Sequence, residues 1–141
     1  MSPPPRYSSM SVGDDLPALA IALDRADLAR YASASGDDNP IHLDDTHAQG
    51  VGLPGVIAHG MLVMGMAARV VTQWLADPGA IVSYDAGFLR PVPVPLTGPV
   101  HLTVTGSIAT KLPDGLVAIR IRASCNQANV LKRAVLVARV L

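Results

Sequence analysis

The hydrophobic positions in the first third of the chain change from a continuous run to a helical spacing. The run from Leu16 to Leu23 predicts a short strand. Residues 25–35 then place apolar and small side chains on one face at helical intervals, which predicts a helix. Asp24 and Asp27 suit the N-cap and N3 positions of a capping box at its start. Gly36 predicts its end.

A long apolar segment lies near the middle of the chain, after a polar stretch. Residues 37–54 hold few apolar positions at regular spacing, and we expect only a short helix there, at residues 44–49. From His59 to about Ala76 nearly every position is apolar, which predicts a single buried helix. The turn residues Asp77-Pro78-Gly79 predict its end.

Alternating apolar and polar positions predominate after this helix and predict strands. The expected strands cover residues 81–89, 101–110, 116–125 and 130–141. Prolines at 91, 93 and 95 cannot donate in a central ladder, so we expect that segment at a sheet edge or a crossover.

The order of these elements indicates the fold class. A strand, then helices, then about four antiparallel strands are typical of an α+β domain. We expect the sheet to wrap around the long helix. The domain should cover residues 11–141, after a loose tail of Pro- and Ser-rich sequence at residues 1–10.

Composition narrows the classes of protein to which the chain can belong. Half of the 141 residues are apolar, 16% are charged, the mean hydropathy is +0.35 and the formal net charge is zero. These values exclude an intrinsically disordered chain and argue against a nucleic-acid-binding domain with a basic surface. A domain of this size buries only roughly 68% of its unfolded-chain surface, so the apolar excess predicts a partner subunit or an apolar ligand.

The cysteine content and the apolar runs bear on localisation. Cys125 is the only cysteine, so no intrachain disulfide can form. No basic segment followed by an apolar run stands at the start, and the apolar stretch from Gly60 to Val71 is too short to span a bilayer. We therefore expect a cytoplasmic protein without a membrane partner.

The charges are segregated along the chain. The first 85 residues contain ten Asp and four Arg, whereas the remainder contains one Asp and seven Arg or Lys. The basic part is either an ordinary solvated surface or a surface for an anionic carrier, cofactor or partner.

Asp37, Asn39 and His42 bring an acid, an amide and an imidazole together within six residues. On a regular strand or helix the Asp37 and His42 side chains would diverge, but Gly36 and Pro40 break the backbone and allow them to converge. Histidine can take and give protons at neutral pH, and the carboxyl group can act as its acid or base partner. Asn39 would orient either group. The competing interpretation is an ordinary turn without chemistry.

A metal site is the other chemistry to consider in this region. His42, Asp44 and His47 are close enough in sequence to act as ligands. No cysteine is nearby and no HExxH helix is present, so we expect no metal.

The second candidate segment opens the long apolar helix, at residues 57–62. A helix N-terminus presents free N–H groups and the positive end of the helix dipole. Gly60 has no side chain, so a carbonyl oxygen can approach its N–H as in an oxyanion hole. The competing interpretation is that Gly60 only permits close packing of the helix on the sheet. We expect His59 to orient its neighbours.

The two segments together resemble the MaoC-like (R)-specific enoyl-CoA hydratases and (3R)-hydroxyacyl-ACP dehydratases. The hydratase-2 motif of that family is matched by Tyr31 and Ser35-Gly36-Asp37-x-Asn39-Pro40-Ile41-His42 and, after a gap of five residues, Ala48. A second family motif is matched by Ala58-His59-Gly60-Met61. The resemblance covers residues 12–141, and its first motif is long and specific.

Two further segments look most like the β subunits of the mycobacterial dehydratases of type II fatty-acid (mycolic acid) synthesis. They are Trp74 with Asp77-Pro78-Gly79-Ala80, and Pro91-Val92-Pro93-Val94-Pro95. The chain departs from the family at Leu96-Thr97-Gly98, where members usually have Gly-Asp. The departure affects a loop and none of the motif residues.

The resemblance implies a hot-dog fold and a homodimer or heterodimer with the acyl chain near its interface. It implies reversible hydration of trans-2-enoyl thioesters to (3R)-3-hydroxyacyl thioesters, carried by CoA or acyl carrier protein, without a metal, nucleotide or redox cofactor. The implied catalytic residues are Asp37, His42, Asn39 and Gly60, and the implied substrate-binding residues are His59, Met61 and Met64. Candidates for binding the carrier phosphates are Arg120, Arg122, Lys132 and Arg133.

Two other functions fit the same fold. One is an acyl thioesterase, which would release free CoA, and the intact Gly-Asp-x-Asn-Pro-x-His run argues against it. The other is an acyl-binding subunit of a heterodimeric dehydratase. Loss of Asp37 or His42 would have indicated such a subunit, but both are present.

Overall fold

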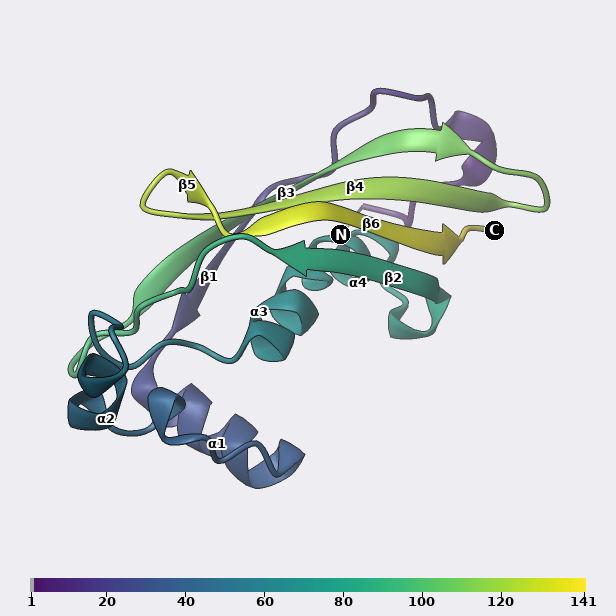
Figure 1. Cartoon of the computed structure of the whole chain (residues 1–141). Coiled ribbons are helices and arrows are strands. Elements are labelled where there is room, and N and C mark those ends of the chain that lie inside the picture. The colour runs from purple at the N-terminus through teal and green to yellow at the C-terminus, as the bar shows by residue number, and fades with distance from the viewer. Residues whose placement is uncertain (1) are drawn as a thin grey trace.

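An antiparallel sheet curves over two consecutive helices in the computed structural model, which describes residues 2–141 (Figure 1). Its strand order is β1 (Leu19–Leu23), β3 (Val100–Lys111), β4 (Leu116–Cys125), β6 (Leu131–Arg139) and β2 (Ile81–Phe88), and the short β5 (Ala128–Asn129) pairs with β4. The helices are α1 (Arg25–Ser35), α2 (Asp45–Gly50), α3 (Gly60–Ala67) and α4 (Arg69–Leu75). Short 3-10 helices cover Tyr7–Ser9, Pro40–His42 and Pro78–Ala80. The α+β class predicted from the order of elements is confirmed.

Alternating side chains of the strands form the core on the concave face of the sheet. Every second residue of β4 from Val117 to Cys125 is buried. Ile119 of β4 faces Ile108 of β3 and Leu136 of β6, and all three side chains are almost completely buried. Full burial of one such side chain contributes about 1.5–3 kcal/mol, so apolar packing is the main force that holds the helices against the sheet.

The first helix follows its sequence signals closely. The Asp24 carboxylate accepts from the N–H of Asp27, and the Asp27 carboxylate accepts from the N–H of Asp24, which completes the capping box. Gly36 ends α1 in the left-handed conformation, with φ of 79°. The predicted limits, residues 25–35, are confirmed.

The central helix differs from the prediction of one continuous segment from His59 to Ala76. It is divided at Ala68 into α3 and α4. The Tyr84 hydroxyl on β2 donates to the carbonyl oxygen of Met64 at 2.9 Å, and the helical hydrogen bond from Ala68 to that oxygen is long, at 3.3 Å. A side chain that shares a helical acceptor weakens the regular ladder, which accounts for the break. Burial raises the pKa of Tyr84 to about 12, so the hydroxyl stays a donor.

The central helix is also less buried than its composition predicted. Met61 is 60% exposed, and Leu62, Met64 and Met66 are partly exposed. A helix that is apolar all round is expected to be covered on every side. In the single chain the sheet covers only the face with Val63, Ala67 and Val71.

The segment before the first strand is packed at its end, whereas the composition predicted a loose tail over residues 1–10. The Tyr7 hydroxyl donates to the carbonyl of Leu112 at 2.6 Å. The Lys111 ammonium donates to the carbonyl oxygens of Tyr7 and Met10, each at 2.9 Å. The Met10 side chain is buried in the core. Residues 7–10 therefore belong to the folded domain.

The proline-rich segment forms a crossover beside the start of α3, as its spacing predicted. Val92 accepts a backbone hydrogen bond from Ala58, and Val94 donates one to Val56. These bonds use the valines between the prolines, which cannot donate. The segment thereby supports residues 56–58, which lead into α3. No helix among the described residues 2–141 is long and apolar enough to cross a membrane.

Gly115 offers a direct test of the turn between β3 and β4. Its φ is +73°, and a Cβ there would lie 2.7 Å from the carbonyl oxygen of Val140. Gly98 has a similar φ of +79°, but a Cβ there would meet nothing within 4 Å. We expect Gly115→Ala to lower the free energy of unfolding by about 2–4 kcal/mol and Gly98→Ala by only about 1 kcal/mol, because both add left-handed strain and only the first adds a clash. Urea unfolding measures both values, and equal losses would contradict the clash.

Candidate active site

The loop between α1 and α2 brings Asp37 and His42 together. Gly36 reverses the chain after α1, and the Asn39 side-chain oxygen accepts from the N–H of Ile41 at 3.2 Å. Asn39 thereby caps the 3-10 helix at Pro40–His42 and turns the His42 side chain inward. Asp37 Oδ2 and His42 Nε2 lie 4.0 Å apart. The Asp37 side chain is half-exposed and the His42 side chain is buried.

Two histidine hydrogen bonds join this loop to the segment before α3. His42 Nδ1 lies 2.7 Å from the carbonyl oxygen of Ile57, and His59 Nε2 lies 3.0 Å from the carbonyl oxygen of Asp37. A carbonyl oxygen only accepts, so each of these ring nitrogens carries a proton. The neutral His42 ring therefore has its free lone pair on Nε2, on the side of Asp37. That arrangement is what a general base beside a carboxyl group requires.

The histidine rings are packed as well as hydrogen-bonded. The rings of His42 and His59 stack at a centroid distance of 3.9 Å, and Tyr31 meets His59 edge-on at 4.6 Å. His59 is only 1% exposed, and its Nδ1 has no hydrogen-bond partner among the described residues. His59 thus holds the backbone of Asp37 and packs against the ring of His42. It does not line the cavity described next.

A largely apolar cavity of about 340 Å³ lies beside His42 and the start of α3, and Asp37 is not among its lining residues. His42 and Gly60 line it, together with aliphatic side chains that include Val63, Val130 and Leu131. Gly60 is the first residue of α3, so its N–H has no acceptor within the helix and lies at the positive end of the helix dipole. The site therefore combines an acid–base pair, an N–H donor for a developing oxyanion and space for an apolar group.

Comparison with known proteins identifies the family. The family model described as a MaoC like domain matches residues 9–123. The chain belongs to the MaoC-like domain family. An (R)-specific enoyl-CoA hydratase from Rhodospirillum rubrum is 36% identical over 94 residues, which are 66% of this chain and 65% of that protein. The 3-hydroxyacyl-thioester dehydratase X of Mycobacterium tuberculosis is 37% identical over 86 residues, which are 61% of this chain and 30% of that protein.

Solved structures confirm the hot-dog fold. A MaoC-like dehydratase superposes with a TM-score of 0.93 and 34% identity, over 98% of this chain and 43% of that one. The R-hydratase PhaJ1 of Pseudomonas aeruginosa superposes with a TM-score of 0.82 and 27% identity, over 96% of this chain and 86% of that one. The MaoC-like domain thus spans less than two thirds of the curated relatives above. A HadBC dehydratase complex from M. tuberculosis is 18% identical and shows the fold alone, so the resemblance to mycobacterial β subunits stays a prediction.

The possible metal ligands that come together in this MaoC-like domain differ from those considered in the sequence. The side chains that come together are Asp37, His42 and His59, with ligand atoms within 4.8 Å of one another, and not the sequence candidates Asp44 and His47. One nitrogen of each imidazole ring donates to a carbonyl oxygen, His42 Nδ1 to Ile57 and His59 Nε2 to Asp37, which leaves one lone pair on each ring. The Asp44 carboxylate instead caps α2 by accepting from Thr46 and His47.

Several residues implied by the family resemblance lie outside the cavity. Met61 and Met64 are not among its lining residues. Arg120 and Arg122 line a separate polar pocket on the other face of the sheet, with Asp15 and Ser107. Lys132 lies across Gly87, where a Cβ would be 2.8 Å from its Cγ.

Sequence reasoning missed two residues at the cavity. Phe88 is the last residue of β2, Arg90 lies two residues beyond it, and both line the cavity. Arg90 Nη1 also donates to the carbonyl of Asn129 at 2.8 Å. Neither residue stands in a motif, and only the pairing of β2 with β6 brings them to the site.

An ion pair supports the segment that leads into α3. The Asp45 carboxylate accepts from the Arg25 guanidinium at 2.7 Å and from the N–H of Val56 at 2.9 Å. Arg25 Nε also donates to the carbonyl of Val94 at 2.8 Å. Asp45 and Arg25 thus connect α1, α2, the crossover and the segment before α3. The Val56 N–H, followed by Arg25, holds the pKa of Asp45 below its ordinary value of 3.8.

The lowered pKa of Asp45 predicts a pH dependence of stability. The ionised carboxylate stabilises the folded chain fully above pH 3.8, and this contribution disappears as the pH falls through the lower pKa of the folded state. We expect Asp45→Asn to be less stable than the wild type by a constant amount from neutral pH to about pH 5, and the difference to shrink below about pH 4. Urea unfolding at a series of pH values measures it. A difference that persists unchanged to about pH 2 would contradict the role of the charge.

Proposed function

We propose that this MaoC-like domain catalyses the reversible hydration of trans-2-enoyl thioesters to (3R)-3-hydroxyacyl thioesters. The observation that carries the proposal is that His42 and Gly60 line the same apolar cavity, while the Asp37 carboxylate lies 4.0 Å from Nε2 of His42. Relatives named as (R)-specific enoyl-CoA hydratase and 3-hydroxyacyl-thioester dehydratase support it. The cavity takes the acyl chain, and the thioester carbonyl oxygen accepts from the Gly60 N–H.

In the dehydration direction, neutral His42 removes a proton from C2 through Nε2. The negative charge moves to the thioester oxygen, where the Gly60 N–H and the dipole of α3 stabilise it. The C3–oxygen bond then breaks as Asp37 gives its proton to the leaving hydroxyl, which departs as water. The double bond forms between C2 and C3.

In the hydration direction the same two residues exchange roles. The Asp37 carboxylate takes a proton from water as its oxygen attacks C3, and the His42 imidazolium gives its proton to C2. The pair thus carries one shared proton in both directions, on Asp37 before dehydration and on His42 after it. The carbonyl of Ile57 accepts from His42 Nδ1 throughout and stabilises the imidazolium. These groups supply every proton transfer in the reaction, so the proposal includes no metal, nucleotide or redox cofactor.

The thioester carrier in this proposal is CoA or acyl carrier protein, and the functional unit is a pair of hot-dog subunits. Large apolar side chains stay exposed on the single chain around the cavity and α3, among them Met61, Phe88 and Leu89. A second subunit, identical or different, would cover them. Solved structures that share the fold include the ChsH1-ChsH2 and HadBC complexes of M. tuberculosis, at 22% and 18% identity.

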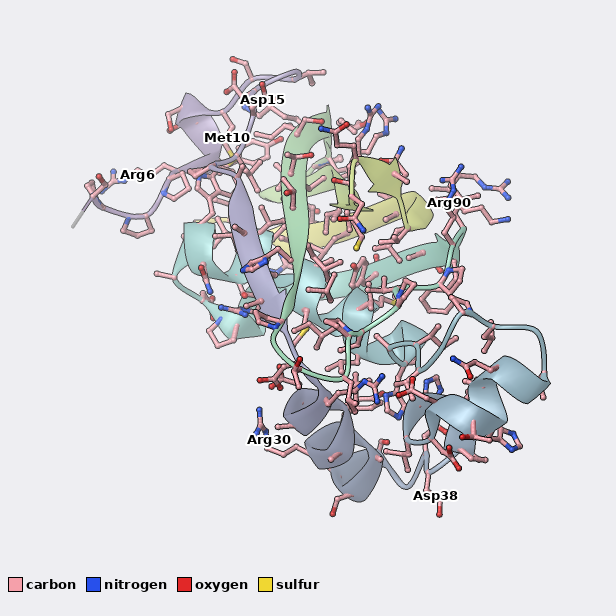
Figure 2. The ribbon with its side chains drawn as sticks, turned by 90° about the vertical axis from the view of Figure 1, so that its left-hand side faces the viewer. Arg6, Met10, Asp15, Arg30, Asp38 and Arg90 are labelled. Atoms are coloured by element: carbon pink, nitrogen blue, oxygen red, sulfur yellow. The ribbon has the colours of Figure 1, made fainter. Side chains whose placement is uncertain are left out.

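The assay that tests the reaction is the loss of crotonyl-CoA absorbance on addition of the purified protein, alone and with a candidate partner subunit. We expect Asp37→Asn and His42→Ala each to lower kcat by about 10²–10⁴-fold, because each removes one proton-transfer group. Asp38→Asn is the matched control, since Asp38 is exposed in the same loop and points away from the molecule (Figure 2).

Three results would contradict this proposal. The wild type could show no hydration under either condition. The Asp37 and His42 variants could be as active as the wild type. Release of free CoA in place of hydration would instead identify a thioesterase, in which water attacks C1.

A further inference from the structure

We propose that the ring of Phe88 selects the length of the acyl chain that the cavity accepts. This rests on the proposed function, since it assigns the cavity to the acyl group of the thioester. Phe88 is the only phenylalanine of the chain and the last residue of β2. No sequence motif includes it.

The ring lies directly against the start of α3. A Cβ built on Gly60 would lie 3.0 Å from Cζ of Phe88 and 3.1 Å from Cε1 and Cε2. Real side chains rarely approach this closely, so the outer edge of the ring occupies the space that a larger residue at position 60 would need. A thioester held by the Gly60 N–H therefore lies beside this ring.

The surroundings of the ring suit an acyl tail and not the polar arm of the carrier. Aliphatic side chains of Val63, Val92 and Leu131 line the cavity with it. The guanidinium of Arg90, which also lines the cavity, donates to the carbonyl of Asn129. A pantetheine arm contains amides that need hydrogen-bond partners, whereas an acyl tail needs only apolar contact. The part of the cavity bounded by Phe88 is thus the place for the tail.

Phe88 differs in its exposure from the aliphatic core residues of the wall, and shares this exposure with Leu89. It is 49% exposed, whereas Val63, Val92 and Leu131 are at most 5% exposed and belong to the core. Shortening a core residue would leave a void and destabilise the fold. Shortening Phe88 would extend the cavity toward the surface that the proposed second subunit covers. The volume of about 340 Å³ is near the lower end for ligand cavities, which span about 300–1,000 Å³, so one aromatic ring makes a large difference to it.

The experiment measures binding of saturated acyl-CoAs, which cannot be hydrated. Isothermal titration calorimetry compares butanoyl-CoA and dodecanoyl-CoA on the wild type, Phe88→Ala and Phe88→Leu. We expect Phe88→Ala to raise the affinity for dodecanoyl-CoA relative to butanoyl-CoA by about tenfold or more, and Phe88→Leu to raise it less. Val82→Ala is the control, because Val82 is an exposed apolar residue of the same strand that does not line the cavity. It should leave the ratio of the two affinities unchanged.

Each outcome decides the proposal. An unchanged ratio in Phe88→Ala that is folded by circular dichroism would overturn it, as would an equal change in Val82→Ala or the absence of acyl-CoA binding by the wild type. If Phe88→Ala does not fold, the ratio measured on Phe88→Leu decides. Hydration of crotonyl-CoA is measured on the same wild-type preparation. A wild type that binds acyl-CoA without hydrating it would contradict the proposed reaction and leave the chain selection by Phe88 standing.

Discussion

The site depends on two loops that hold each other in place through their histidines. His42 of one loop donates to a carbonyl of the other, and His59 of the second loop donates to the carbonyl of Asp37 in the first. The backbone of Ile57 also donates to the carbonyl of Ile41. Neither loop belongs to a long helix or to the sheet, so the hydrogen bonds between the two loops satisfy backbone groups that regular secondary structure would otherwise pair. They also determine which nitrogen of each ring carries the proton, and hence which atom of His42 is basic.

The sequence predicted the parts of this arrangement that depend on neighbouring residues. The capping box of α1, its end at Gly36 and the convergence of Asp37 with His42 follow from local backbone rules and are all present. Strands β3 and β4 were also predictable, because each is buried on one face and alternates accordingly. The fold class and the approach of Asp37 to His42 could therefore be predicted from the sequence.

Features that depend on contacts between distant segments were not predictable in this way. The break at Ala68 is caused by a hydroxyl from β2, and the apolar run of the central helix contains no sign of it. Phe88 reaches Gly60 only because β2 is a sheet edge that passes the start of α3. Met61 has the composition of a core residue, yet the sheet leaves it uncovered. The basic residues of the second half of the chain do not gather on one surface either. Arg120 lines a separate polar pocket, whereas Arg90 lines the cavity.

The bond between Tyr84 and Met64 has a consequence for the motions of the site. Strand β2 holds the end of α3 through Tyr84 and its beginning through Phe88, so the short helix is fastened to one strand at both ends. That strand is paired along its length with β6 in the sheet. Local opening of a protein takes place in cooperative units, and an element fastened to a strand of a sheet opens with that strand. The Gly60 amide should therefore share the slow opening of the sheet, while Asp37, half-exposed on its loop, follows a faster one. We therefore expect the oxyanion donor to be the more rigid part of the site and the acid to be the more mobile part.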